Sequence, residues 1–375
     1  MRAIFATPGR WQGLAATGLA LGLAGLGGGP GGWAAVVLLL VAGAAGGAVV
    51  GQRLPRGGRV AALALVTLAL GLAGAGLAGD AAPDGGARLW VGVVALWLGA
   101  WMLVALVAEE AAGRGGAAGV LAPAVFGLTL LWLWEVATRG LGVPSVILPA
   151  PSAIAARMAE SADVLWIDFV QTIVKGALTG YAIGAAAAVA VAVAVDRSPF
   201  LQRGLLPVGN FVAALPIVGI APILVMWFGF DWQSKAAVVV VMVFFPVLVN
   251  TLAGLGATDR AGRDLMATWS AGYWQSLWKL RLPAAMPFIF NGLKIATTLA
   301  LIGAIVAEFF GSPIKGMGFR ISTEVGRLQL DMVWAEIAVA ALAGSALYGL
   351  VAAMERRVTF WHPSQRDRAR GPQRR

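Results

Sequence analysis

Cysteine is absent from the 375-residue chain, and histidine occurs once, at His362. Without cysteine the chain can form no disulfide and offers no thiolate to a metal ion. With a single histidine near the C-terminus, a histidine-based metal site or a Ser-His-Asp triad is untenable, so we predict no metal, no cofactor and no catalytic residue. The phosphate-binding pattern GxxxxGK[S/T] is missing as well, so we do not expect this chain to hydrolyse a nucleotide.

Charge is also scarce. Only 12% of the residues are charged and 59% are hydrophobic, whereas a soluble domain is about 25% charged. Glycine is abundant, with 51 residues, as is common where membrane helices pack closely. The composition therefore indicates a multi-pass membrane protein embedded in a lipid bilayer. We attribute the net charge of +10 to basic cytoplasmic loops and predict no nucleic-acid partner.

Long apolar runs account for most of the chain. A membrane segment must satisfy its own backbone hydrogen bonds, so each run is expected to be a helix. The predicted fold class is all-α, with about ten transmembrane helices, at 12–28, 33–51, 60–79, 89–107, 119–137, 170–195, 205–229, 236–254, 285–307 and 332–353.

The distribution of lysine and arginine orients these spans. With ten spans and a cytoplasmic N-terminus, nineteen basic residues fall inside and seven outside. This bias predicts that both termini are cytoplasmic. A charged, glycine-rich break at 108–118 separates four N-terminal spans from six others. We expect 141–168 to be an outer-face loop with a short interfacial helix near 151–161, begun by Pro151, and 359–375 to be a basic cytoplasmic tail.

The segment DLMATWSAGYWQSLWKLRLP, residues 264–283, differs from the spans on either side. Its apolar residues recur about every four positions, the spacing of one helix face, and polar residues surround them. The pattern predicts two short helices that meet near 270–272, where Gly272 permits a turn. Pro283 is expected to end the second helix and to start the next span. Amphipathicity alone favours an interfacial helix lying flat on the membrane.

The same segment resembles the cytoplasmic loop of ATP-binding-cassette importer permeases. That loop reads Glu-Ala-Ala, three residues, Gly, nine residues, Ile, one residue, Leu-Pro. Here Asp264-Leu265-Met266 takes the first three positions, Ser270 the glycine, Leu280 the isoleucine, and Leu282-Pro283 the end. Asp for Glu, Leu-Met for Ala-Ala and Ser for Gly are departures from the pattern.

Four further segments resemble the nitrate/sulfonate/taurine/bicarbonate permease family, which includes permeases for pyrimidine and riboflavin precursors. They are LPAPSAI (148–154), LPIVGIAPILVMWFGF (215–230), FFPVLVNTLAGL (244–255) and NGLKIATTLALIGAIVAEFFG (291–311). The resemblance covers about 120–360. It implies a six-helix type I importer permease at 119–358, a coupling loop at 258–284 and an N-terminal extension at 1–118 whose role it leaves open.

The resemblance also implies partners and a place. They are a cytoplasmic ATPase subunit, a periplasmic substrate-binding protein and a second copy of this chain, in a bacterial inner membrane. The coupling-loop residues would be Asp264, Ala267, Trp269, Ser270, Ala271, Gly272, Tyr273, Leu277, Leu282 and Pro283. We expect Trp269, Tyr273 or Leu277 to give the ATPase an apolar contact. Asp264 either pairs with a basic group of the ATPase or caps a helix N-terminus.

Polar residues within the six-span part are candidates for the translocation path. They are Asn250, Asn291, Lys294, Thr297, Thr298 and Glu308. Lys294 either lies in the path, where it would suit an anionic substrate, or extends to the inner interface, the reading that we favour. Glu308 fits a gate or a structural ion pair.

The substrate stays open between a nitrate-like or sulfonate-like anion and a vitamin precursor. The rival functions are a secondary transporter and a membrane scaffold or enzyme, neither coupled to an ATPase.

Overall fold

The computed structural model describes residues 117–198, 200–201, 203–204, 209, 216–311 and 314–361, together with single helical positions at 90, 93, 97, 100, 101 and 104. Every regular element within these residues is a helix, in agreement with the all-α prediction. The predicted spans at 12–28, 33–51 and 60–79 lie outside the described residues, as does most of 89–107. The count of ten spans therefore stays a prediction.

The described helices belong to two compact units, which divide at Ala155 and Ala156. In the first unit, α5 (Ala117–Gly140) leads through a short loop to α6 (Pro151–Glu160). Glu135 accepts hydrogen bonds from the backbone N–H of Ser152 at 2.8 Å and from its hydroxyl at 2.7 Å. A carboxylate beside the first turn of a helix satisfies unpaired N–H groups and complements the helix dipole. The predicted short helix with Pro151 as its first residue is thus confirmed.

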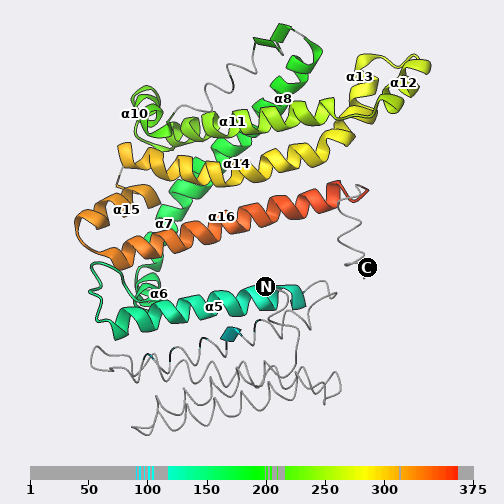
Figure 1. Cartoon of the computed structure of the whole chain (residues 1–375). Coiled ribbons are helices and arrows are strands. Elements are labelled where there is room, and N and C mark those ends of the chain that lie inside the picture. Colours follow the sequence, from blue (N-terminus) through cyan, green and yellow to red (C-terminus); the bar gives the residue numbers. More distant parts are fainter. Residues whose placement is uncertain are drawn as a thin grey trace, which may run out of the picture. The chain divides into compact units, whose positions relative to one another are not determined.

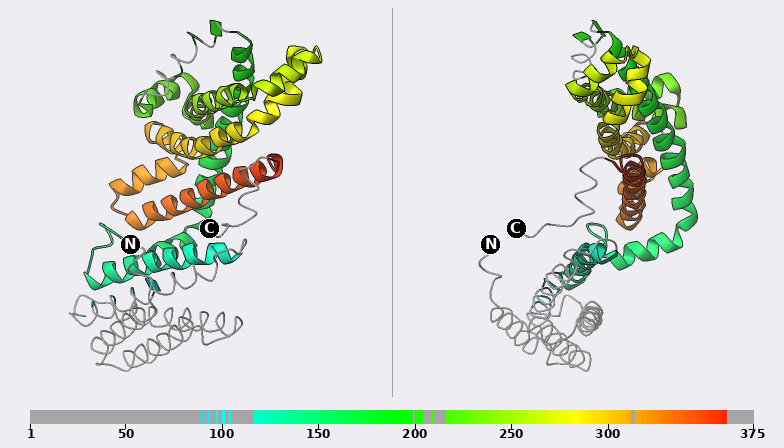
Figure 2. Two further views of the ribbon diagram at one scale, coloured as in Figure 1. Left: turned by 45° about the vertical axis from the view of Figure 1, so that its right-hand side comes forward. Right: turned by 90° about the vertical axis from the view of Figure 1, so that its right-hand side faces the viewer.

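The second unit contains most of the remaining helices (Figure 1). They are α7 (Ala162–Phe169), η3 (Val170–Leu178), α8 (Thr179–Arg197), α10 (Ile217–Phe228), α11 (Trp232–Gly256), α14 (Leu282–Phe310), α15 (Met317–Gly326) and α16 (Leu330–Val358). Helices α11, α14 and α16 lie side by side, and the long helix formed by α7, η3 and α8 crosses them at a steep angle (Figure 2).

Four helices in the described residues are long and apolar enough to cross a membrane. They are Ala162–Arg197, Trp232–Gly256, Tyr273–Phe310 and Leu330–Val358, and their apolar windows have mean hydropathies of 1.8 to 2.5. A helix rises 1.5 Å per residue, so about 20 residues span the ~30 Å hydrocarbon layer. By length and composition, each of these helices could therefore cross the membrane.

The helices of this unit approach closely because small residues line their contacts. A Cβ atom on Gly180 of α8 would lie 2.6 Å from the Cβ of Val239 in α11. A Cβ on Gly292 of α14 would lie 2.9 Å from that of Asn250, also in α11. No side chain larger than hydrogen fits at these two positions without displacing the facing helix. The abundant glycine in the sequence therefore has a structural role in packing α11 between α8 and α14.

Two predicted spans differ from the helices of the structure. The span predicted at 205–229 is interrupted at Pro216, which is not helical, and the 12 residues of α10 follow it; most of 205–215 lies outside the described residues. Proline disfavours the helical conformation in the residue before it and lacks an N–H donor, so a helix readily begins just after it. The span predicted at 170–195 begins earlier, at Ala162, because the end of the supposed outer loop is already helical.

Candidate functional site

The loop between α11 and α14 forms two short helices, as predicted. They are α12 (Arg260–Thr268) and α13 (Tyr273–Ser276), and η4 (Leu277–Arg281) follows α13 directly (Figure 1). Helix Tyr273–Phe310 is continuous, so the expectation that Pro283 ends the second short helix is wrong. The wider π turn of η4 just before Pro283 accommodates a residue that has no N–H donor. Helices α13 and α14 thus belong to one continuous helix.

The turn between the two short helices depends on Ser270 and not on Gly272. Ser270 has φ of 52°, in the left-handed region, whereas Gly272 has φ of −67°, which any residue adopts. The prediction that Gly272 permits the turn is therefore wrong. In the loop pattern of importer permeases, glycine stands at the position of Ser270. Glycine adopts the left-handed conformation without steric cost, which explains the preference for it at this position.

This conformation gives a first testable prediction. Ser270→Gly should leave the loop intact, whereas Ser270→Val should destabilise the turn by about 1–2 kcal/mol, because a side chain with a branched β-carbon strongly disfavours the left-handed region. The rate of trypsin cleavage within 258–284 of the purified protein measures the difference. Ser276→Val is the matched control, because Ser276 has an ordinary helical φ of −64°. Equal cleavage of the two valine variants would contradict a strained turn.

An ion pair fixes the second half of the loop to α8. Asp196 accepts two hydrogen bonds from Arg281, at 2.8 and 2.6 Å, and one from the hydroxyl of Tyr273 at 3.0 Å. Arg281 also donates to the carbonyl oxygen of Leu255, at the end of α11, at 3.1 Å. The guanidinium thus joins the loop to two other helices, in the two-pronged geometry that makes arginine–carboxylate pairs strong. This ion pair and the hydrogen bond from Tyr273 thus connect η4 and α13 to the bundle.

The three residues predicted to give a partner an apolar contact differ in how accessible they are. Leu277 is only 1% exposed and packs on Leu255, Ala285 and Ile289, so it stabilises the loop and cannot reach a partner. Tyr273 is half-buried and bonded to Asp196. Trp269 is 72% exposed. The prediction for Leu277 is wrong, and Trp269 is the candidate that the structure leaves accessible.

Two further tryptophans on the loop were missed. Trp274 and Trp278 are 52% and 64% exposed, and Arg197 lies over the Trp274 ring at 5.9 Å. They are four residues apart and so lie on one face of the helix. This face lies beside the apolar face on which the sequence prediction was based. A cation–π contact can hold such a ring in one orientation. The accessible face of the loop is therefore rich in tryptophan.

The remaining predicted loop residues are mostly accessible. Asp264 is exposed and is the fifth residue of α12, whose N-terminal cap position belongs to Asp259. The alternative that Asp264 caps a helix is therefore wrong, and its pairing with a basic group of the ATPase stays a prediction. Ala267 is exposed, and Ala271, Leu282 and Pro283 are half-buried.

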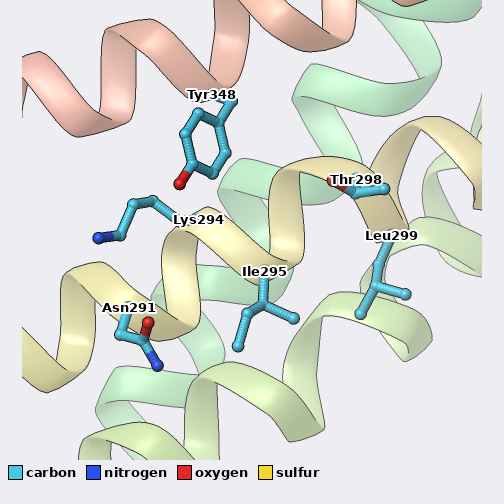
Figure 3. A pocket seen from close by; sticks show the side chains of 6 residues that line it. All are labelled: Asn291, Lys294, Ile295, Thr298, Leu299 and Tyr348. Atoms are coloured by element: carbon cyan, nitrogen blue, oxygen red, sulfur yellow. The ribbon is translucent and has the colours of Figure 1, made fainter. Parts of the chain in front are cut away.

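The structure brings three of the six predicted path residues together. A cavity of about 440 Å³ between α14 and α16 is lined by Asn291, Lys294, Ile295, Thr298, Leu299 and Tyr348 (Figure 3). Asn250 lies next to it and accepts a hydrogen bond from Asn291 at 3.1 Å. Thr297 is buried, and its hydroxyl donates to the carbonyl oxygen of Lys294 in its own helix.

Lys294 forms an ion pair with Glu355 of α16, with 2.8 Å between Nζ and Oε2. The two side chains are 20% and 13% exposed. A low local dielectric strengthens such a pair, and the two charges cancel. Lys294 is thus held against α16 beside the cavity, and sequence reasoning missed Glu355 because it is 61 residues away.

Glu308 belongs to a different place from the other predicted path residues. It is 1% exposed and accepts hydrogen bonds from the hydroxyl of Thr172 at 2.9 Å and from the N–H of Gly318 at 2.7 Å. Nearby, Gln171 donates to Asp231 at 3.0 Å, and this hydrogen bond lowers the pKa of Asp231 from its ordinary value. The contacts of Glu308 are those of a structural group that fixes the start of α15 against η3.

These features define a class: a multi-pass helical membrane protein in which an exposed, firmly anchored helical loop joins two membrane helices. Residues 180–360 match the family described as binding-protein-dependent transport system inner membrane component, and the chain belongs to this family. In such transport systems the membrane component is a permease subunit and not itself an enzyme. The family implies an ATPase subunit and a substrate-binding protein as partners.

Individual relatives agree. The chain is 34% identical over 233 residues to a probable ABC transporter permease of Haemophilus influenzae, covering 61% of this chain and 93% of the relative. It is 29% identical to a formylaminopyrimidine transport permease of Halalkalibacterium halodurans, over 65% of this chain and 97% of the relative. It is 30% identical to a riboflavin transport system permease of Chloroflexus aurantiacus, over 63% and 88%. Permeases named for sulfonate, taurine and bicarbonate transport match as well.

Proposed function

We propose that this chain is the transmembrane subunit of an ATP-driven importer and that its loop at 258–284 docks on a separate ATPase. The carrying observation is the helical pair α12–α13, which presents Trp269 while Asp196 and Arg281 fix its base. An exposed aromatic side chain on a rigid support is the usual core of a binding hot spot. The rival functions, a secondary transporter and a membrane scaffold or enzyme, do not require an exposed tryptophan on a rigidly held loop.

Coupling would then work by displacement. Closure of the ATPase on ATP would move α12 and α13, and the continuous helix Tyr273–Phe310 would carry that movement into the membrane. Leu277 and the ion pair of Asp196 with Arg281 would keep the loop from absorbing the movement. Alternation between inward-open and outward-open states then follows from a shift between two packed arrangements of the helices.

The assembly that we propose has two copies of this chain, because one chain provides one coupling loop while ATPases of this class act as pairs. The loop faces the cytoplasm with both termini, and the periplasmic binding protein meets the opposite face. This orientation rests on the excess of lysine and arginine in the segments assigned to the inside.

The cavity between α14 and α16 is the proposed part of the translocation path. Asn291, Lys294 and Thr298 present polar groups to it, and the Tyr348 ring extends from α16 toward α14 (Figure 3). Because Glu355 already neutralises Lys294, an anion would have to displace that carboxylate. A planar, uncharged heterocycle would instead stack on Tyr348 and pair with the amide of Asn291. We therefore favour a vitamin-precursor heterocycle over a nitrate-like or sulfonate-like anion.

Transport by the complete complex in proteoliposomes tests this proposal. We expect ATP-dependent uptake of a radiolabelled aminopyrimidine or of riboflavin, and no uptake of taurine, when each is supplied with the matching binding protein. Glu355→Gln should lower heterocycle uptake several-fold, since the unpaired Lys294 charge would be left beside the path. Glu160→Gln is the control, because Glu160 is 70% exposed and lies 3.9 Å from its arginine partner. Uptake of taurine alone would contradict the substrate class, and uptake that needs no ATP would contradict the importer.

A further inference from the structure

Three carboxyl side chains meet in the interior of the second unit, in a cluster that the proposed function does not use. They are Asp168 of α7, Glu308 of α14 and Glu336 of α16, and each is at most 1% exposed. Burying a carboxylate is costly unless hydrogen-bond donors or a cation compensate its charge. The donors that face each of the three groups therefore decide which of them is ionised.

Asp168 and Glu308 both have hydrogen-bond donors. Asp168 accepts hydrogen bonds from the N–H of Gly316 at 2.6 Å and from Nε of Arg320 at 2.9 Å. Glu308 accepts from Thr172 and from the N–H of Gly318. Lys235, which donates to the carbonyl oxygens of Phe230 and Gly311, contributes a positive charge near Glu308. Each of these two carboxylates thus has its own donors; Asp168 also pairs with Arg320, and Glu308 has the charge of Lys235 in its vicinity.

Glu336 has neither. It is 0% exposed, and neither of its oxygens accepts a hydrogen bond from any donor within the described part of the chain. Its carboxyl nevertheless interacts with that of Asp168, and the charges of Arg320 and Glu308 act on it as well. Two ionised carboxylates cannot bond to each other, because both only accept. A single proton between them turns this repulsive contact into a hydrogen bond, as in other buried pairs of carboxyl groups.

We propose that Glu336 is a proton-binding site: in the folded protein it is a neutral carboxylic acid that donates a hydrogen bond to Asp168. With Asp168 balanced by Arg320 and Glu308 by Lys235, a third negative charge would have no counter-ion. The proton gives the cluster a net charge of zero and leaves no buried acceptor facing another acceptor.

The bound proton joins three parts of the fold. Asp168 holds the N–H of Gly316 directly before α15 and the side chain of Arg320 within it. A hydrogen bond from Glu336 adds α16 to this set, so α7, α15 and α16 meet at one carboxylate. Because Asp168 accepts all three bonds, loss of the proton would weaken the attachment of α16 while the contacts of α15 remain.

Infrared spectroscopy of the full-length protein in lipid nanodiscs at pH 7 tests the proposal. We expect the carbonyl absorption of a protonated carboxylic acid, shifted when glutamate alone is labelled with carbon-13 and reduced in Glu336→Gln. Glu355→Gln, which removes a carboxylate paired with Lys294, should leave that absorption unchanged. An absorption that Glu336→Gln retains in full, or one that glutamate labelling does not shift, would overturn the proposal.

Thermal unfolding gives a second, independent readout. The amide of Glu336→Gln can donate to Asp168 as the acid does, so this variant should unfold within a degree or two of the wild type. Glu336→Ala removes the donor and leaves a cavity, and should unfold several degrees lower. If Glu336 were ionised, Glu336→Gln would instead remove an uncompensated buried charge and raise the unfolding temperature by several degrees, and the proposal would fail.

Discussion

Arg281→Met should uncouple ATP hydrolysis from transport. The substitution removes two of the three hydrogen bonds to Asp196 and leaves only the one from Tyr273, at a site where the two ionic side chains are 16% and 12% exposed. It also removes the hydrogen bond from Arg281 to the carbonyl oxygen of Leu255. Breaking a fully buried pair costs about 3–5 kcal/mol, and we expect about 2 kcal/mol here because of the residual exposure. That energy corresponds to roughly a 30-fold shift of the loop toward detached states. Uptake into proteoliposomes should fall by roughly 30-fold or more, while ATP hydrolysis continues.

Two variants make this expectation specific. Arg263→Met removes another loop arginine, one that is exposed and donates only to the carbonyl oxygen of Gly256, and should retain most of the uptake. The double variant Asp196→Asn with Arg281→Met has no unpaired charge, so its loop should be more stable than that of the single variant. If Arg281→Met transported as well as Arg263→Met, the ion pair would have no part in coupling.

Trp269→Ala should release the ATPase subunit. Removal of a central tryptophan from an interface costs about 2 kcal/mol or more, which weakens binding roughly 30-fold. Because Trp269 is 72% exposed, folding and membrane insertion should be unchanged. The fraction of ATPase that co-purifies with the tagged permease measures the effect. Trp227→Ala is the control, since Trp227 of α10 is equally exposed at 74% but lies on another helix. Equal retention of the ATPase by both variants would exclude Trp269 from the interface.

The sequence predicted well those features that depend on local composition. Apolar length located the long helices, and Pro151 predicted the start of α6 because the residue types needed there lie within a few positions of each other. The amphipathic spacing of 264–283 predicted a loop of two short helices for the same reason. Boundaries failed where the helix continues past its apolar part, as at Ala162 and through η4 into α14.

The site was less predictable because its contacts join distant segments. Asp196 and Arg281 are 85 residues apart, and Lys294 and Glu355 are 61, so no spacing rule connects them. Leu277 follows the same periodicity as Trp269 but faces the bundle, because a stripe of apolar residues does not say which of them the fold buries. The left-handed conformation of Ser270 was not predicted, because the nearby Gly272 is the residue type that usually allows a turn.

Cross-linking through single cysteines tests docking of the loop most directly, and the chain contains no native cysteine to remove. Trp269→Cys and Trp227→Cys would each be treated with a short thiol-reactive photo-cross-linker in membranes that contain the assembled transporter. The account predicts that Trp269→Cys forms a covalent adduct with the ATPase subunit, more strongly when ATP is bound, and that Trp227→Cys does not. An adduct of Trp269→Cys with lipid alone, in membranes where the ATPase is assembled, would contradict it.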